Sequence, residues 1–511
     1  MDRKEKNERK ARKFIMKIEL LGMLDYEKIK TELKEKVENV DEVIDMLKKN
    51  ETEKRAQIVS SAGRLSRFTG NVFNVLEMSE NNSFEKNLKF IKRVTGMGHD
   101  SITDHDYLVF AIQDVSPVIE QIIIAERFCS FTIKSRREVD FSNVGFYTPN
   151  FHDDNGNVLE NNYEIKEKYQ EYMKSLFKKY SEFEGMGIPK EDARFILPYC
   201  YYSNILMGID AHVLRDMIIK FTKTKYSKIQ ELREFGERLL EIANDKVPYL
   251  TELVEKEECS YVDEIETYLN KYVSENEKNY KILEKVRLIN STPEVDKTIL
   301  VSAFMRRYQL DKENAEALYK KVTNDNPDFK KNLMRKIAFD GDKLELTQVN
   351  FDFQVPISFA VLTHLTRHRT HQIMVPDFVP NVNLSNYKTP PQIKAKCKEE
   401  YDRVYKENVE MYELFKKKYK ICENDLIYFT LSGNMVNVIT NMDGKTLKHI
   451  LALRECTKAQ WETREMATNM HAEIDTLKGA DEYSAILGPS CVTQGYCKEG
   501  KESCGRINNI K

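Results

Sequence analysis

Two stretches of the chain carry the same succession of structural signals, and this internal repeat limits the possible folds more than any other feature. The first stretch opens at residues 58–62 and the second at 300–303. Each continues through a short alternating strand, a Pro, an apolar helix that ends in charged residues, and a Tyr near a second Pro. These are Phe110-Ala111-Ile112, Pro117 and Tyr147 in the first stretch, and Phe351-Asp352-Phe353, Pro356 and Tyr387 in the second. The repeat predicts a duplication, with two related modules joined in one chain.

The chain length of 511 residues suits two such modules with shorter terminal segments. We predict a first module at 51–280, a second at 281–485 and a Cys-rich tail at 486–511. Residues 1–50 are rich in Lys and Glu, and their apolar residues recur at helical spacing, which predicts a helical arm. The apolar residues at the start of this arm are Phe14, Ile15, Ile18 and Leu21.

The charge balance argues against a protein that coats nucleic acid. The 80 Lys and Arg nearly cancel the 82 Asp and Glu, whereas phosphate binding normally needs a basic excess. Small anionic substrates remain compatible, because a local Arg cluster does not show in a balanced total. No apolar run approaches the roughly 18 residues of a membrane span, and the N-terminal segment is too charged for a secretory signal. We therefore expect a cytoplasmic protein with no membrane or nucleic-acid partner.

The sharpest local signal is Arg367-His368-Arg369, which follows an apolar helix. Two guanidinium groups around an imidazole can hold phosphate or carboxylate oxygens, and the imidazole can add a hydrogen bond or accept a proton. A plainer interpretation stays open, because cations often end a helix, where they favour its dipole. His364 and His371 lie close enough to this motif to take part in a site.

A second cluster lies at 447–470, where the apolar residues predict a helix that includes the single Trp of the chain, Trp461. Arg454 and Trp461 share one stripe of that helix by their spacing. An Arg in this place either extends along apolar surface to reach water or meets an anion, and the sequence leaves both open.

With these residues the chain resembles the flavin-dependent thymidylate synthases. The resemblance rests on the Arg-His-Arg motif and on Leu453-Arg454 followed by Ala-Gln-Trp-Glu in the second half. The first half adds three segments similar to that family's motifs, at 98–105, 121–137 and 187–198. The resemblance covers about residues 55–511 as two successive modules. It implies an α+β fold in which each module is a mainly antiparallel sheet packed with helices.

The resemblance also implies an activity. Members of this family make dTMP from dUMP with methylenetetrahydrofolate as the one-carbon donor, FAD as the cofactor and NADPH as the reductant. It assigns catalytic roles to Arg454, facing the uracil, and to Ser135, donating to the substrate. Further substrate contacts fall on Gln121, Arg137, Arg194 and Arg367. Cofactor contacts fall on Arg367, His368, Arg369, His105 and His449.

Neither module carries the whole motif set. In the first, the Arg-His-Arg positions read Ala125-Glu126-Arg127, and the position of the uracil-facing Arg falls at Phe221. In the second, the segment with Ser135 and Arg137 has no counterpart. The losses are complementary, so we hypothesise one composite site shared by the two modules. Since the family is homotetrameric, two modules per chain suggest a homodimer with four modules.

Two alternatives to this function remain. One is a non-catalytic descendant that keeps a flavin or nucleotide pocket, and the other is an enzyme that acts on another pyrimidine nucleotide. Loss of the Ser135 loop from the second module favours the first alternative. Retention of that loop in the first module and of Arg454 in the second favours catalysis.

The nine Cys residues include three in the last part of the chain, Cys491, Cys497 and Cys504, set among Gly residues. Three thiolates are one short of a closed zinc site, and Cys456 is the candidate fourth ligand. The spacing is not that of a zinc knuckle, so the alternative is a tail of free thiols. We state zinc as a possible second cofactor on this clustering alone.

Overall fold

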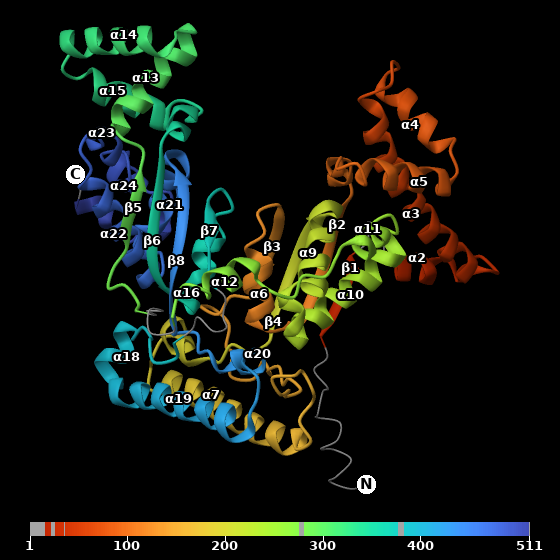
Figure 1. The fold of residues 1–511 in the computed structure, drawn as a ribbon. Helices are drawn as coiled ribbons and strands as arrows, with labels where there is room; N and C mark the ends of the chain where they lie inside the picture. The colour runs from red at the N-terminus through yellow and green to blue at the C-terminus, as the bar shows by residue number, and fades with distance from the viewer. Residues whose placement is uncertain (1–15, 22–25, 35, 275–280, 377–382, 510–511) are drawn as a thin grey trace. The chain divides into compact units, whose positions relative to one another are not determined.

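The structure is a computed structural model that describes residues 16–21, 26–34, 36–274, 281–376 and 383–509 (Figure 1). The chain divides into two compact units. Unit 1 comprises Met1–Ser181, Pro198–Asn279 and Glu410–Phe429, and unit 2 comprises Glu182–Leu197, Tyr280–Val409 and Thr430–Lys511. Each unit therefore includes a short segment from the half of the chain that mainly forms the other unit.

Each unit is built on one four-stranded antiparallel sheet, and the two sheets have the same topology. In unit 1 the order is β1 (Lys17–Leu21), β2 (Tyr107–Val115), β4 (Ser203–Asp210), β3 (Cys129–Ile133). In unit 2 it is β5 (Arg287–Ser291), β6 (Asn350–Ser358), β8 (Met435–Asp443), β7 (Gln372–Met374). Packed with helices, these sheets confirm the predicted α+β fold with two related modules.

An apolar helix follows the second strand of each sheet: α6 (Pro117–Ile124) in unit 1 and α16 (Phe359–Thr366) in unit 2. A fully buried carboxylate caps each one. Glu231 accepts the backbone N–H of Ser116 at 2.8 Å, and Glu462 accepts that of Ser358 at 2.8 Å. An acidic group at a helix N-terminus satisfies unpaired N–H groups and favours the dipole. The same cap in both units supports the duplication independently of sequence identity.

A pair of helices follows the last strand of each half, β4 or β8. These are α9 (Ala211–Lys223) and α10 (Gln230–Lys246) in unit 1, and α21 (Gly444–Arg454) and α22 (Trp461–Asp475) in unit 2. Asp210 and Asp443 cap α9 and α21. The next residue in each case donates its N–H to the residue before the second strand, Ala211 to Asp106 at 2.8 Å and Gly444 to Val349 at 2.9 Å. These bonds fix the correspondence of positions between the units along these helices and at the start of β2 and β6.

The first half contributes the segment 182–197 to unit 2. It holds the end of α7 (Asn162–Gly185), α8 (Lys190–Ala193) and the short η2 (Arg194–Ile196). Phe195 stacks on Trp461 with ring centroids 5.8 Å apart, and Trp461 Nε1 donates to Asp192 at 2.8 Å. Tyr405, on α19 (Lys398–Tyr419), donates to the carbonyl of Phe195 at 2.7 Å. The segment is thus part of the core of unit 2.

The second half contributes the segment 410–429 to unit 1. Phe415 and Phe429 pack on Tyr169, with ring centroids 6.5 and 5.8 Å away. Tyr428 donates to the buried Glu231 at 2.9 Å. Since these contacts are apolar and fully enclosed, each half of the sequence needs the other to complete its core.

Two expectations about secondary structure are wrong. The arm predicted to be helical is helical at Tyr26–Leu33 and from Val40 onward, but its described part begins with a strand. Ile18 and Leu21 lie in β1, which pairs with β2, while Phe14 and Ile15 fall outside the described residues. Backbone pairing with the edge of the sheet overrides the local helical spacing there. Pro356, which was expected to follow the strand, lies inside β6, opposite Asn437 of β8. β5 pairs with β6 only as far as Gln354, so no N–H is needed at Pro356 on that side.

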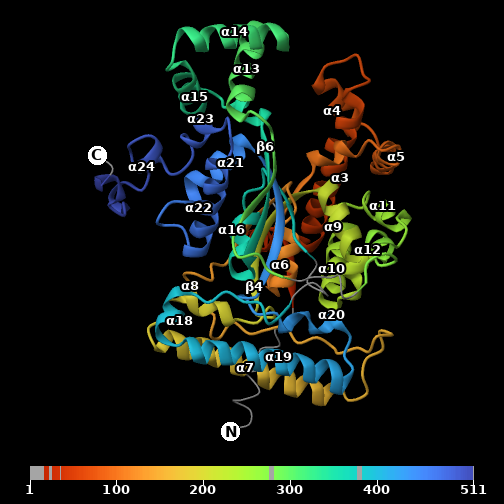
Figure 2. The same cartoon turned by 60° about the vertical axis from the view of Figure 1, so that its left-hand side comes forward.

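Three helices lie between α2 (Tyr26–Leu33) and β2 in the sequence: α3 (Val40–Leu65), α4 (Val72–Glu80) and α5 (Phe84–Thr95). Three helices occupy the corresponding place in unit 2, as Figure 2 shows: α13 (Val295–Tyr308), α14 (Lys312–Asp325) and α15 (Phe329–Phe339). A short helix then leads into each second strand, η1 (Asp100–His105) and η5 (Leu344–Gln348). The other helices are α11 (Thr251–Lys256), α12 (Glu264–Leu269), α18 (Pro391–Lys396), α20 (Glu423–Leu426), α23 (Asp481–Ser484), α24 (Ser490–Thr493), η3 (Lys225–Lys228), η6 (Ile427–Phe429), η7 (Gly500–Glu502) and η8 (Arg506–Asn509).

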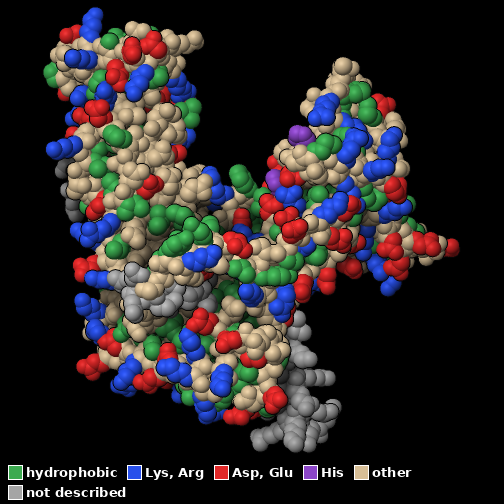
Figure 3. Space-filling model, viewed as in Figure 1, with side chains coloured by type: hydrophobic (Ala, Val, Ile, Leu, Met, Phe, Trp, Pro, Cys, Tyr) green, Lys and Arg blue, Asp and Glu red, His purple; other side chains and the backbone are tan. Residues whose placement is uncertain are grey.

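The surface carries mixed charge. On the face drawn in Figure 3, Lys and Arg side chains are interspersed with Asp and Glu. Across the described ranges, no helix is both long enough and apolar enough to cross a membrane.

Candidate functional site

Unit 2 brings Arg454 and His368 into direct contact. Arg454 is the last residue of α21, and His368 comes just after α16. Arg454 Nε donates to His368 Nε2 at 2.9 Å, and its Nη2 donates to the carbonyl of His364 at 3.1 Å. A hydrogen bond therefore joins Arg454, which the sequence assigned to the substrate, to His368, which it assigned to the cofactor.

His368 is a neutral imidazole. Burial, followed by the nearby Arg454, His371 and His449, lowers its pKa to about 3. Since Nε2 accepts the bond from Arg454, the ring proton is on Nδ1. His368 therefore offers an N–H donor on its other side, and at neutral pH it is not a proton source.

The neighbours of this pair hold its geometry. The ring of His449, also on α21, lies edge-on to His368 with centroids 5.9 Å apart. His364 shares a hydrogen bond between Nδ1 and Thr463 Oγ1 at 3.1 Å. Arg367 is the residue at the C-terminus of α16, and Arg369 follows two residues later. The predicted cofactor residues of the second half thus gather where α16 ends beside α21.

The corresponding place in unit 1 has different chemistry. Glu126, at the position of His368, pairs with Lys220 of α9. Phe221, at the position of Arg454, is buried and packs edge-on to Phe235 with centroids 5.3 Å apart. An ion pair and an aromatic contact replace the arginine and imidazole there, in agreement with the sequence comparison of the two halves.

Arg194 comes from the first half of the sequence but belongs to unit 2, as Arg454 does. It is 2% exposed, and its Nε donates to the carbonyl of Glu191 at 3.2 Å. The neighbouring Asp192 accepts from Trp461 and from the backbone N–H of Gln392 at 3.3 Å. These contacts hold the segment 182–197 in unit 2 and so fix the backbone on which Arg194 lies.

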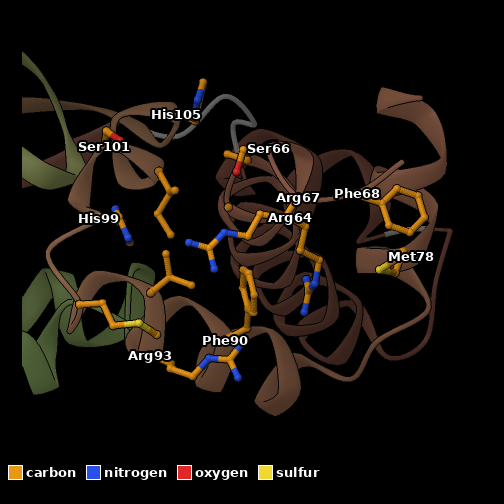
Figure 4. A pocket seen from close by; sticks show the side chains of 15 residues that line it. Arg64, Ser66, Arg67, Phe68, Met78, Phe90, Arg93, His99, Ser101 and His105 are labelled. Carbon is orange, nitrogen blue, oxygen red and sulfur yellow. The ribbon is translucent and has the colours of Figure 1, made fainter. Parts of the chain in front are cut away.

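Unit 1 contains a cationic cavity of about 540 Å³ between α3, α5 and η1. Its lining includes Arg64, Arg67, Arg93, His99, Ser101 and His105, together with Phe68, Phe90 and Met78. Figure 4 shows the Arg64 side chain directed toward His99, with Phe90 beside it. This is where the structure places His105, which the sequence assigned to cofactor binding.

The arginines of this cavity carry uncompensated charge. Arg64 lies over the Phe90 ring at 4.1 Å and Arg93 at 5.5 Å. Arg64 Nη1 donates to Asn87 Oδ1 at 3.1 Å and Ser79 Oγ at 3.2 Å, and within the described ranges Arg64, Arg67 and Arg93 make no ion pair with a carboxylate. Burial, and then Arg93, lower the pKa of Arg64. Such a cavity suits a ligand with both an anionic and an aromatic part.

At the matching place in unit 2, carboxylates neutralise the arginine charge. Arg306 and Arg307 end α13 as Arg64 ends α3. Arg306 donates to Asp342 at 2.7 Å, and both arginines pair with the buried Glu345. Asp342 and Glu345 lie at η5, where unit 1 has His99 and Ile102 at η1. Only unit 1 keeps free positive charge at this place.

The remaining predicted residues of the first half lie in unit 1. Gln121, in α6, is buried and donates to Tyr199 Oη at 3.0 Å. Ser135 Oγ accepts the backbone N–H of Arg137 at 3.3 Å, just beyond β3. Between them, Arg136 is buried and pairs with Glu120 at 2.8 Å. The Arg136 ion pair anchors the loop, and it leaves Ser135 and Arg137 partly exposed.

The four Cys residues predicted as metal ligands do gather. Cys456, Cys491, Cys497 and Cys504 all line one small cavity of about 20 Å³ in unit 2. Zinc is nevertheless not supported, because the described residues contain no group of three or more His, Cys, Asp or Glu able to hold a metal ion. Clustering along the sequence and four positive-φ glycines at 488, 495, 500 and 505 bring the thiols to one place but not into a coordination shell.

Sequence reasoning missed the arginines of the cavity. Arg64 and Arg67 stand one turn apart in a stretch without nearby acids, and this spacing was the available signal. Arg93 has no such signal, because only the packing of α5 against α3 brings it there.

Comparison with known proteins agrees with this organisation. A sequence model of the family described as thymidylate synthase complementing protein matches residues 47–249 and 287–477. The chain belongs to this family. It is similar to the flavin-dependent thymidylate synthase of Pyrococcus abyssi, with 29% identity over 225 residues, which is 42% of this chain and 89% of the relative. The flavin-dependent thymidylate synthase of Clostridium tetani is 26% identical over 249 residues, 44% of this chain and 95% of the relative. Each relative thus corresponds to less than half of this chain.

Proposed function

We propose that this chain is a flavin-dependent thymidylate synthase that converts dUMP to dTMP with methylenetetrahydrofolate and NADPH. The main support for this proposal is that the two units keep complementary parts of the binding and catalytic residues. Unit 1 keeps the uncompensated cavity of Arg64, and unit 2 keeps His368 and Arg454. At the place that matches the cavity, unit 2 has ion pairs. At the place that matches His368 and Arg454, unit 1 has an ion pair and an aromatic contact. This pattern supports one composite site per chain rather than two degraded ones.

In this proposal Arg454 acts on the uracil. The C5 carbon becomes nucleophilic as negative charge develops toward N3 and O4, and a fixed guanidinium stabilises that charge where water is excluded. The hydrogen bond to His368 holds the guanidinium in position. Ser135 donates a hydrogen bond to the substrate, and Gln121, Arg137, Arg194 and Arg367 orient it. Orientation of this kind lowers the entropic part of the barrier.

The residues present fit a flavin. The cavity of unit 1 offers arginine charge for phosphates and the Phe90 ring for stacking, with His105 on its lining. The neutral His368 offers an Nδ1–H donor, and His449, Arg367 and Arg369 extend the same edge in unit 2. When bound, the flavin supplies the hydride for the transferred carbon and takes it in turn from NADPH.

A matched pair of variants tests flavin binding. Arg64→Met removes uncompensated charge from the cavity, so purified protein should retain much less FAD, measured by absorbance near 450 nm per chain. Arg306→Met removes an arginine already neutralised by Asp342 and should leave FAD content unchanged. Wild-type protein should hold about one FAD per chain. A colourless protein that binds no added FAD would reject the proposal.

Turnover is tested by dUMP-dependent oxidation of NADPH. Ser135→Ala and Arg454→Ala should each abolish most of it, because they act in the same composite site. Ser142→Ala, in the exposed loop after Ser135, serves as the control. Flavin binding without any response to dUMP would favour a non-catalytic descendant, and a response to another pyrimidine nucleotide alone would favour a changed substrate.

A further inference from the structure

A second cationic group in unit 2 lies next to the Arg454 site, and its three lysines take no part in the functions assigned so far. It consists of Lys343 before η5, Lys448 and His449 on α21, and Lys498 in the C-terminal tail. The Lys448 ammonium lies over the Phe339 ring at 4.5 Å. The ring of His449 in turn touches that of His368. The group therefore continues directly from the site that holds Arg454.

The charges of this group repel one another. Burial, then Lys343 and Lys498, lower the pKa of Lys448 to about 8. Burial, then Lys498 and Lys448, lower that of His449. In the part of the chain that the structure describes, no carboxylate pairs with Lys343, Lys448 or Lys498. Lys343 and Lys448 are half-buried, and His449 and Lys498 are exposed. Like charges held together are costly unless an anion completes them.

Comparison with unit 1 shows that this arrangement replaces an ion pair. By the correspondence fixed at Asp210 and Asp443, Lys448 stands where unit 1 has Arg215, and His449 where it has Asp216. Counted back from Asp106 and Val349, Lys343 stands where unit 1 has Asp100. Arg215 pairs with Asp100 at 3.0 Å and with Asp216 at 2.8 Å. Unit 2 thus has basic residues at both acidic positions and keeps the central cation.

The tail adds a further cation to this group. Arg335 of α15 donates to the carbonyl of Thr493 at 3.1 Å, and Arg506 donates to that of Glu455 at 3.4 Å. These contacts fasten the tail on both sides of Lys498. Cys497 and Glu499 line the small thiol cavity on either side of Lys498 in sequence. The folded tail therefore carries the exposed Lys498 near enough to α21 to lower the pKa of Lys448 and of His449.

We propose that Lys343, Lys448 and Lys498 form a subsite for the polyanionic tail of a ligand whose reacting part lies at Arg454 and His368. The chemistry it recognises is a short chain of negative oxygens. Two ligands of the proposed reaction carry such a chain: a dinucleotide has its pyrophosphate, and a folate has its glutamyl carboxylates. The inference rests on the proposed function for the identity of the ligand but not for the binding of the anion.

The test measures anion binding directly, without turnover. Isothermal titration calorimetry on the full chain uses inorganic pyrophosphate in one arm and γ-linked triglutamate in the other. At least one probe should bind, and Lys448→Gln and Lys498→Gln should each weaken it about tenfold, the effect of losing one charge-assisted contact. Lys320→Gln, on the exposed part of α14, should not change it.

The probe whose binding the lysine substitutions weaken identifies the kind of ligand. Loss of pyrophosphate binding assigns a phosphate-bearing ligand, and loss of triglutamate binding assigns the folate. Wild-type protein that binds neither probe overturns the inference, as does unchanged binding in Lys448→Gln. Since neither probe needs dUMP or flavin, failure of the proposed function leaves this result readable.

Discussion

The hydrogen bond from Trp461 to Asp192 joins a segment from the first half of the sequence to a helix of the second. The bond is 2.8 Å long, and Asp192 is 2% exposed. Burial raises the pKa of this carboxyl, and the Trp461 bond opposes that rise. Replacing Trp461 by Phe leaves the carboxylate with the weaker 3.3 Å bond from Gln392.

The expected cost follows from these contacts. Loss of a hydrogen bond to a buried charged group costs about 1.5–3 kcal/mol. The smaller ring also loses apolar contact with Phe195, at about 1 kcal/mol for some 40 Å². Trp461→Phe should therefore lower the free energy of unfolding of unit 2 by about 2.5–4 kcal/mol.

A double-mutant cycle with Asp192→Ala isolates the bond. Urea unfolding is followed by circular dichroism, because Trp461 is the only Trp and its fluorescence is lost in the variant. The coupling energy should be about 1.5–3 kcal/mol. A control cycle pairs Trp461→Phe with Asp475→Ala, an exposed carboxylate on the same helix, and should be additive within about 0.5 kcal/mol. A Trp461–Asp192 coupling as small as that of the control would refute the reasoning.

Three further outcomes are expected. Arg454→Ala should lower kcat for dUMP turnover by about 100-fold or more. Arg464→Ala, whose guanidinium donates to the backbone carbonyls of Thr457 and Ala459, should stay within about threefold of wild type. Equal effects of the two substitutions in steady-state kinetics would contradict the role of Arg454. The pKa of His368, about 3, is depressed below the usual value near 6.5, so its contribution to stability is present above pH 6.5 and is lost as pH falls toward 3. His368→Asn should remove up to about 1.4 kcal/mol per pH unit of that acid dependence, seen in urea titrations between pH 4 and 7, and an unchanged slope would count against a neutral buried imidazole. Gly433→Ala places a Cβ against a buried tyrosine hydroxyl and 3.0 Å from a backbone carbonyl, so it should lower the free energy of unfolding by about 1–3 kcal/mol. The control Gly185→Ala places its Cβ in open space and should be neutral or slightly stabilising in thermal unfolding.

Local sequence signals predicted the parts of the molecule that short-range physics controls. The alternating strands at Phe110 and Phe351 form β2 and β6, and the apolar helices after them form α6 and α16. The resemblance assigned both Arg454 and the Arg-His-Arg motif to the site but predicted no contact between them, and the structure joins Arg454 to His368 by a hydrogen bond. The strand at Ile18 was not expected, because its neighbour β2 is distant in sequence.

By itself, the sequence predicted two related modules and the division of the motif residues between the halves, because these depend on residue type and on the order of local signals, and the family resemblance implied the α+β class. Only the tertiary structure decided which charges are compensated. Arg64 and Arg306 end similar helices, yet one faces an open cavity and the other faces Asp342 and Glu345. Lys448 and Arg215 occupy matching positions, yet Lys343 lowers the pKa of Lys448 whereas Asp100 pairs with Arg215. Electrostatic energy depends on distances across the fold rather than along the chain, so a basic residue is left without a carboxylate partner in one unit and is neutralised at the matching position of the other.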